Sequence, residues 1–188
     1  MKNILIAFLI MGSTSAFAVP TATSVDLNQY MGQWFQLAAI PQSFAKDCIN
    51  NEMAEYKLID DETVEVVNSC DEADGVNVAR GRARINPKFD DPAKLQVTFV
   101  RFLFGWIWSF GGDYWIIDLD PDYQWSIVGN PDQDALWILS RTQIMDNATL
   151  NDIRTRVDAA GFDTCAINMS PNDVSPFSGS EKLCDLKL

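Results

Sequence analysis

Apolar and polar residues alternate in short runs between residues 32 and 141. The runs are rich in β-branched and aromatic residues, and Asp, Asn, Gly or Pro separates each run from the next. We expect eight strands, over residues 32–40, 50–59, 63–70, 77–86, 94–101, 113–119, 123–129 and 135–141. Because the separators are short and turn-like, the pattern predicts an all-β, up-and-down antiparallel sheet. Eight strands are about the number at which such a sheet closes into a barrel with room inside for side chains or one small ligand.

The hydrophobic period changes after Arg141, which indicates one C-terminal α-helix. Its apolar face comprises Leu150, Ile153, Val157 and Ala160. Asp146 or Asn147 is the expected N-cap, and Gly161 the left-handed residue that ends the helix. The apolar stripe is narrow, so we expect the helix to pack against the outside of the barrel. Barrel and helix then form one domain over residues 19–169, followed by an irregular tail over residues 170–188.

The N-terminal residues have the features of a secretory signal peptide. Lys2 supplies the positive charge, residues 4–11 the short apolar run, and residues 16–18 the small-x-small cleavage pattern Ala-Phe-Ala. We expect residues 1–18 to be removed on export to the periplasm or the cell exterior. The apolar run is shorter than the roughly 20 residues that a membrane-spanning helix needs. The first Cys is Cys48, so we expect no lipid anchor on an N-terminal Cys.

Charge and cysteine content narrow the possible partners. Without Lys2 the chain has 13 basic and 26 acidic residues, a formal charge of −13. This excess repels phosphate backbones and anionic membranes, so we expect no nucleic-acid partner. Four Cys in an exported chain predict two disulfides, in one of three pairings. Zinc is disfavoured, because the chain has no C-x2-C pair and no His.

Cys48 precedes the second strand and Cys70 ends the third, so the turn at residues 60–62 brings them opposite each other on one hairpin. We therefore place Cys48–Cys70 first, which leaves Cys165 to pair with Cys184.

Three short motifs resemble the lipocalin signature in order and spacing. They are Gly32-Gln33-Trp34, Asp120-Pro121-Asp122-Tyr123 and Arg141 at the end of the eighth strand. The chain resembles a bacterial lipocalin of the apolipoprotein D-like branch, from the start of the mature chain to about residue 169. The resemblance implies that Trp34 plugs the closed end of the barrel and that Arg141 lies across its ring. It also leaves open a bridge from Cys48 or Cys70 to Cys184, because related lipocalins often tie the barrel to the tail.

Alternation along the strands gives candidate ligand contacts inside the barrel. Arg141 must reach inward to cover Trp34, which fixes the phase of the last strand. For the sixth strand we choose Trp115 and Ile117, because the opposite face would turn Asp118 inward. The predicted ligand-binding residues are Tyr56, Val97, Phe99, Trp115, Trp137 and Leu139.

The segment from Phe99 to Phe110 is unusually apolar for a loop. It includes Phe102, Phe104, Trp106 and Trp108, and lipocalin topology places it at the open mouth of the barrel. Exposed apolar surface tends to mark a contact with ligand, membrane or partner. The loop is therefore either a projecting lip or a lid folded over the barrel entrance.

The family resemblance implies a binding and transport protein for a small hydrophobic ligand of the fatty-acid or lysophospholipid class. We expect no enzyme, metal or cofactor, since the chain has no His and no catalytic or nucleotide-binding motif. Two alternatives stay open: docking on a protein or membrane through residues 102–110, and an enzyme that uses a free Cys. We expect a monomer or weak homodimer, with transient membrane contact as a further possibility.

Overall fold

The computed structural model describes residues 18–188. The expected signal segment, residues 1–18, therefore lies outside the described residues except for Ala18. Over the described part of the chain, no helix combines the length and apolarity needed to cross a bilayer. The helices are α1 (Leu27–Tyr30) and α2 (Asn147–Ala159). The strands are β1 (Gly32–Ala39), β2 (Asn50–Leu58), β3 (Thr63–Glu72), β4 (Gly75–Ile85), β5 (Lys94–Thr98), β6 (Arg101–Phe102), β7 (Gly105–Trp106), β8 (Gly112–Leu119), β9 (Trp125–Gly129), β10 (Leu136–Ser140) and β11 (Asn168–Met169).

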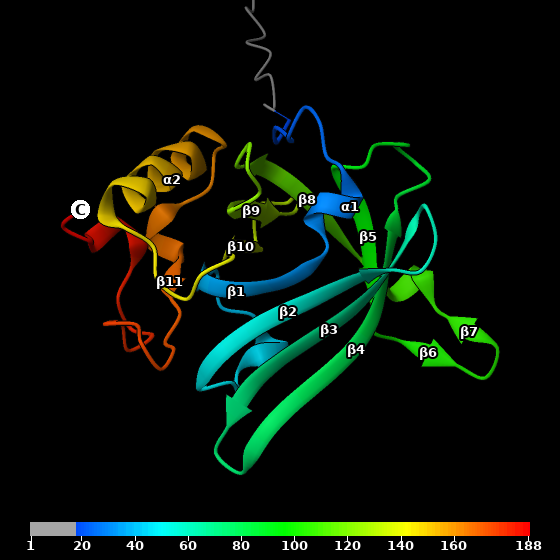
Figure 1. Ribbon diagram of the computed structural model, residues 1–188, viewed down its shortest axis with the longest axis horizontal. Coiled ribbons are helices and arrows are strands. Elements are labelled where there is room, and N and C mark those ends of the chain that lie inside the picture. The colour runs from blue at the N-terminus through cyan, green and yellow to red at the C-terminus, as the bar shows by residue number, and fades with distance from the viewer. Residues whose placement is uncertain (1–17) are drawn as a thin grey trace, which may run out of the picture.

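Eight of these strands close into one antiparallel barrel (Figure 1). Neighbours follow the order β1-β2-β3-β4-β5-β8-β9-β10, and β10 pairs back onto β1 with Phe35 opposite Ser140. The predicted fold class, eight-strand barrel plus C-terminal helix, is confirmed. The sequence did not predict α1, the β6–β7 hairpin, several short 3-10 helices or β11, which pairs with Ala38 and Ala39 on β1.

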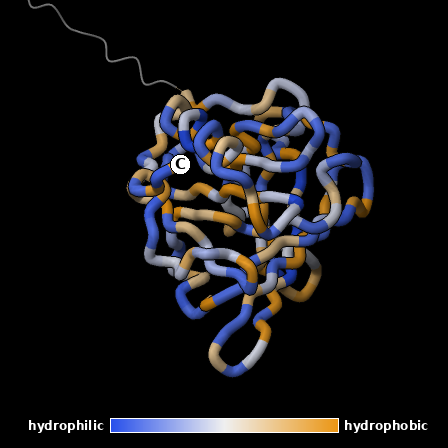
Figure 2. Tube along the Cα trace, turned by 60° about the vertical axis from the view of Figure 1, so that its left-hand side comes forward, coloured by the Kyte–Doolittle hydropathy of each residue, from blue (hydrophilic) through white to orange (hydrophobic). Residues whose placement is uncertain are grey.

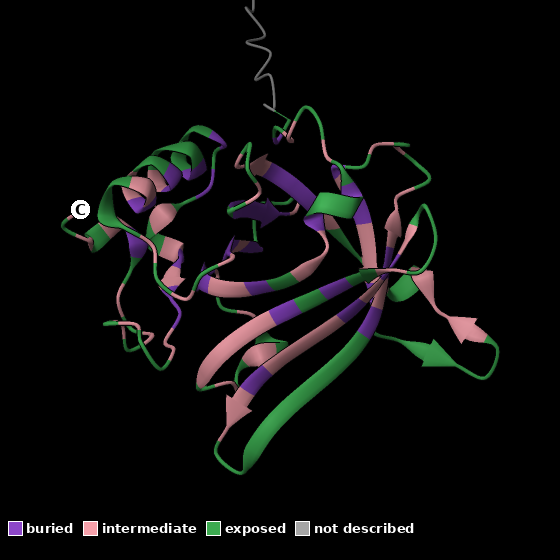
Figure 3. Cartoon of the chain, in the orientation of Figure 1, coloured by how far each residue is buried: buried purple, intermediate pink, exposed green. Residues whose placement is uncertain are grey.

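Strand alternation divides the core into an inner and an outer layer. Leu139 on β10 belongs to the cluster inside the barrel, whereas its neighbour Ile138 packs outside with Ile153 and Val157 of α2. Figures 1 and 3 show α2 lying beside the barrel, with buried residues along the side that faces the strands. The helix ends as predicted. Asp146 accepts a hydrogen bond from the Thr149 amide at 2.9 Å, and Gly161 has a φ of +89°.

The predicted phase of β8 is wrong. Trp115 and Ile117 belong to the outer cluster, and Tyr114 and Ile116 face inward. A β-bulge between Ile116 and Asp118 is the physical reason, because it adds one residue and breaks the strict alternation of sides. Asp118 therefore also points outward, where it pairs with Arg156 of α2 at 2.9 Å. The reason for choosing Trp115, to keep Asp118 out of the barrel, does not hold.

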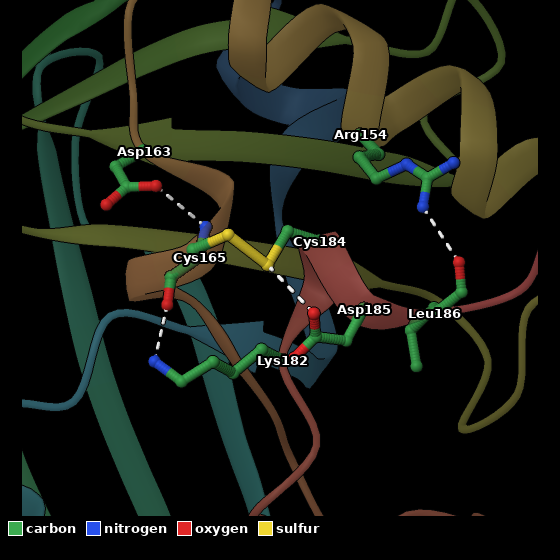
Figure 4. Close-up of a disulfide and its surroundings, with 7 residues drawn as sticks. All are labelled: Arg154, Asp163, Cys165, Lys182, Cys184, Asp185 and Leu186. Carbon is green, nitrogen blue, oxygen red and sulfur yellow. Dashed lines mark hydrogen bonds between the residues drawn. A yellow bond between two sulfur atoms is a disulfide. The ribbon is translucent and has the colours of Figure 1, made fainter.

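Two disulfides join Cys48 to Cys70 and Cys165 to Cys184, the pairing that the sequence placed first. The second one fastens the tail beneath α2 (Figure 4). Beside it, Lys182 donates to the carbonyl of Cys165 at 2.6 Å. The tail therefore adds to the outer core, where Leu183 is completely buried.

The two ends of the barrel differ. α1 covers one end, together with the β2–β3, β4–β5 and β8–β9 turns. At the opposite end lie the β1–β2 loop, the β3–β4 turn, residues 99–111 and the β9–β10 loop. The β3–β4 turn extends below the rest of the chain and has both hydrophilic and hydrophobic residues along it (Figure 2). This longer, looser end is the mouth.

Candidate ligand cavity

The barrel encloses a cavity of about 630 Å³. Volumes of several hundred Å³ are typical of small-molecule sites. Most of its wall is apolar, with contributions from β2, β3, β4, β5 and β10. Five of the six predicted ligand contacts line it: Tyr56, Val97, Phe99, Trp137 and Leu139. The sixth, Trp115, lies outside the barrel wall against Phe89, with ring centroids 5.4 Å apart.

Three tyrosine hydroxyls meet deep in the barrel, near its closed end. The Tyr114 hydroxyl lies 2.9 Å from that of Tyr30 and 3.1 Å from that of Tyr56, and Tyr30 also bonds Ser126 at 3.1 Å. Burial raises the pKa of Tyr30 to about 12, against the opposing effect of its hydrogen bonds. Burial raises the pKa values of Tyr56 and Tyr114 as well. The cavity floor is therefore polar but uncharged at neutral pH.

Trp34 and Arg141 close this end of the barrel. The Trp34 side chain is fully buried, and its indole nitrogen donates to the Tyr30 carbonyl at 2.8 Å. The Arg141 guanidinium carbon lies 3.7 Å from the centroid of the Trp34 ring. Arg141 also donates to the carbonyls of Gln33 at 2.7 Å and Met31 at 2.8 Å. One side chain thus covers the Trp34 ring and fixes the chain that enters β1.

The other two signature residues, Gly32 and Tyr123, stabilise the same closed end of the barrel. Gly32 has a φ of +94°, and a Cβ there would lie 3.4 Å from Arg141 Nη1. Both observations explain the glycine, with the left-handed backbone as the stronger constraint. Tyr123 accepts from the Asp26 amide through its hydroxyl at 2.9 Å, which ties the segment before α1 to the β8–β9 turn.

At the mouth, Phe99 lies just beyond the end of β5 and packs over Gly81 of β4. A Cβ on Gly81 would lie 2.8 Å from the Phe99 ring, so glycine makes room for the aromatic side chain. Phe44 and Phe110 line the cavity from neighbouring loops and are largely exposed. The entrance is therefore ringed by aromatic residues.

The apolar loop projects away from the mouth. We call Phe102, Leu103 and Phe104 the lip; their exposed fractions are 67%, 78% and 99%. Trp106 and Trp108 are half-buried at its base, where Arg82 lies 5.2 Å from the Trp106 ring centroid and Arg84 lies 4.1 Å from that of Trp108. None of the predicted loop residues Phe102, Phe104, Trp106 and Trp108 lines the cavity. The arrangement is a lip anchored on the outer wall and not a lid.

The cavity wall also contains polar residues that the sequence interpretation missed. Gln36, Glu52 and Asn68 line the cavity. Gln36 is two residues from Trp34, and Glu52 is two residues from Ala54, so the alternation already used for those strands contained the signal. Tyr30 precedes the barrel and carried no such signal.

Among the described residues, one cluster of Cys and Glu side chains has the spacing of a metal site, but it offers no free thiolate to a metal. Cys48, Cys70 and Glu72 have ligand atoms within 4.8 Å of one another, but the two sulfurs are bonded to each other. The same pairing engages all four cysteines of the chain.

Residues 25–172 match the family described as the lipocalin-like domain. This chain belongs to the lipocalin family. It is 33% identical over 153 residues to temperature-induced lipocalin-1 of Arabidopsis thaliana, which covers 81% of this chain and 82% of that protein. It is 30% identical over 162 residues to the outer membrane lipoprotein Blc of Escherichia coli strain K12, covering 84% and 86%. Bovine apolipoprotein D is 33% identical over 147 residues, covering 72% of each chain.

Relatives of both the Blc and the apolipoprotein D type confirm the resemblance drawn from the three signature motifs. Among solved structures, insecticyanin from the tobacco hornworm Manduca sexta superposes with a TM-score of 0.65. Its identity is 21%, and the match covers 86% of this lipocalin and 87% of that chain. At 21% identity, the likeness to insecticyanin concerns the fold alone.

Proposed function

We propose that this lipocalin binds and carries a single-chain amphiphile, of the size of a fatty acid or lysophospholipid, in the barrel cavity. The observation that carries the proposal is the 630 Å³ cavity, closed at one end by Trp34 and Arg141 and open at the other between aromatic residues. Burial of a chain of roughly ten methylenes, at about 0.8 kcal/mol each, offers enough free energy for micromolar binding before association costs.

The cysteines argue against the enzyme alternative. A thiol nucleophile requires a free Cys, and both disulfides together use all four. The chain has no His to act as general base. We therefore propose a binding protein without catalytic activity.

The disulfides also support export. Disulfides persist in oxidising compartments such as the periplasm and the cell exterior. Together with the signal-like residues 1–18, they support our proposal that the mature protein works outside the cytoplasm.

The binding proposal is tested by placing charge or bulk in the cavity. Trp137→Asp puts a carboxylate against the acyl chain and should weaken binding of a single-chain lipid at least tenfold. Ala79→Trp should also weaken binding, because it fills the cavity from an exposed position and leaves the buried core intact. The readout is native mass spectrometry of lipid-loaded protein.

Ile59→Asp is the matched control. It makes the same kind of exchange at an exposed residue outside the cavity lining and should leave binding unchanged. If Trp137→Asp and Ala79→Trp stay folded and bind lipid as well as the control does, the cavity is not the binding site.

We propose a second role for the lip, as a transient contact with membrane. Three adjacent apolar side chains are exposed, and Arg101 flanks them on β6. Arg84 lies at the base of the same loop, so together with Arg101 it places two arginines beside the lip of an acidic protein. Apolar residues with adjacent arginines suit a bilayer surface, where the arginines offset the repulsion expected from the overall charge. Docking on another protein, or weak dimerisation, would use the same exposed surface.

A further inference from the structure

Three acidic residues line the cavity, Glu52, Asp113 and Asp134; Asp113 and Asp134 are exposed, whereas Glu52 is half-buried in the wall on the mouth side. Glu52, Ala54 and Tyr56 of β2 all line the cavity. The Tyr56 hydroxyl is one of the three that meet at the cavity floor. Glu52 is nearer the open end of the same strand. At about 3.3 Å per residue, the two positions are roughly 13 Å apart along the strand. An amphiphile with its chain toward Tyr56 therefore has its polar end near Glu52.

The protein supplies only part of the hydrogen bonding that Glu52 can accept. Gln36 Nε2 donates to Glu52 Oε2 at 2.6 Å and to Ser170 Oγ at 2.8 Å. An ionised carboxylate has about four acceptor positions. Burial raises the pKa of Glu52, while hydrogen bonds with Gln36 and Ser170 act in the opposite direction. Glu52 thus has acceptor capacity left for a ligand.

No cation balances this carboxylate inside the cavity: of the described residues that line it, none is Lys or Arg. Two of the three arginines of β4 are engaged on the outer face, Arg82 with Glu65 at 3.0 Å and Arg84 with the Trp108 ring. Asn68 adds an independent observation, because its side-chain oxygen is buried in the cavity wall without a hydrogen-bond partner. The Glu52 carboxylate and the Asn68 side-chain oxygen can therefore both accept hydrogen bonds from a ligand.

We propose that Glu52 receives the polar end of the ligand and selects single-chain amphiphiles whose head donates hydrogen bonds and carries no net negative charge. Glycerol monoesters, long-chain alcohols and long-chain amines fit this description; free fatty acids do not. A hydroxyl or ammonium head can donate a charge-assisted hydrogen bond to Glu52. A fatty-acid carboxylate would instead face a like charge in a poorly solvated site. This inference rests on the proposed function, of which it names the ligand class.

The test compares three probes with one acyl chain and different heads: oleylamine, 1-monooleoylglycerol and oleic acid. Each is titrated below its critical micelle concentration, with tryptophan fluorescence and native mass spectrometry as readouts. Wild-type protein should bind the amine and the glycerol ester at least tenfold more tightly than oleate. Glu52→Gln, which removes the charge and keeps the shape, should bring oleate and amine affinities within a few-fold of each other.

Glu55→Gln is the matched control, since Glu55 is an exposed residue of the same strand outside the cavity lining. It should keep the wild-type preference, although it removes the same overall charge. Equal binding of all three probes by wild-type protein overturns the inference and leaves the proposed function intact. An equal shift in the two variants also overturns it, because the preference would then come from net charge. Failure of every probe to bind overturns the proposed function itself.

Discussion

Gly32 and Arg141 depend on each other at the closed end of the barrel. The left-handed backbone at Gly32 turns the chain from α1 into β1, and Arg141 binds the carbonyls of that turn. A side chain at position 32 would strain the backbone and approach the guanidinium that covers Trp34. Gly32 is therefore required by the closed end of the barrel, where Arg141 covers Trp34, and it does not line the cavity.

Gly32→Ala should lower the free energy of unfolding by about 1–3 kcal/mol, because a residue with a Cβ is held at positive φ. The measurement is urea denaturation followed by tryptophan fluorescence. Gly112→Ala is the control: a Cβ there meets no atom within 4 Å. Equal stability of the Gly32 variant and the Gly112 variant would contradict this role for Gly32.

Glu52 should make the folded state sensitive to pH. Burial raises the folded pKa of Glu52 above its ordinary value, so the folded state holds this proton more tightly than the unfolded chain does. The resulting contribution to stability is present below about pH 4.5 and is lost as the pH rises through the folded pKa. Glu52→Gln should therefore gain stability over wild type as the pH rises, in denaturation curves measured from pH 4 to pH 8. A difference between the two proteins that is constant with pH would contradict the shifted pKa.

Five of the six residues chosen by alternation line the cavity, but alternation did not reveal the polar chemistry of its wall. Tyr56, Val97 and Leu139 could be placed because each strand carries a regular pattern. Glu52 shares the phase of Tyr56, so alternation was enough to place it on the inner side of β2, but it does not tell how much of the carboxylate is buried. Tyr114 could not be placed, because its side depends on a bulge that only the pairing of β8 with β9 reveals.

At the scale of elements, the eight barrel strands were predictable because Asp, Asn, Gly and Pro mark their ends. The observed strands differ from the expected ones by at most three residues at either end, and the largest difference is at β5, which ends at Thr98. β11 was not predictable, because two residues form a strand only when β1 offers a free edge. The β6–β7 hairpin escaped prediction for a similar reason: its apolar sequence does not alternate, and arginines of β4 hold its base.

Phe104→Asp should reduce binding to lipid vesicles at least several-fold, because the most exposed apolar residue of the lip would become charged. Cosedimentation with vesicles containing phosphatidylglycerol and phosphatidylcholine measures this. Ile144→Asp exchanges an exposed apolar residue elsewhere and should leave vesicle binding unchanged. Wild-type protein that does not sediment with vesicles would rule out the membrane role, and a stable complex of two chains would point to dimerisation.

At the scale of the whole molecule, different parts of the barrel have different roles. One face of the barrel is covered by α2 and the disulfide-linked tail, one end is sealed by Trp34 and Arg141, and the other end opens between aromatic residues (Figure 1). The signature motifs specify the sealed end, which is why the family could be recognised from sequence. The cavity volume depends on how all eight strands pack, and no single motif encodes it.

We propose above all that the cavity holds one amphiphile with an acyl chain. Native mass spectrometry of the protein purified from its exported form tests this most directly, followed by organic extraction and identification of the lipid. We expect an added mass that corresponds to one single-chain lipid per barrel and that is absent from Trp137→Asp. A barrel that carries no lipid as purified, and takes up none from an added panel of neutral, cationic and anionic single-chain lipids, would contradict the proposal.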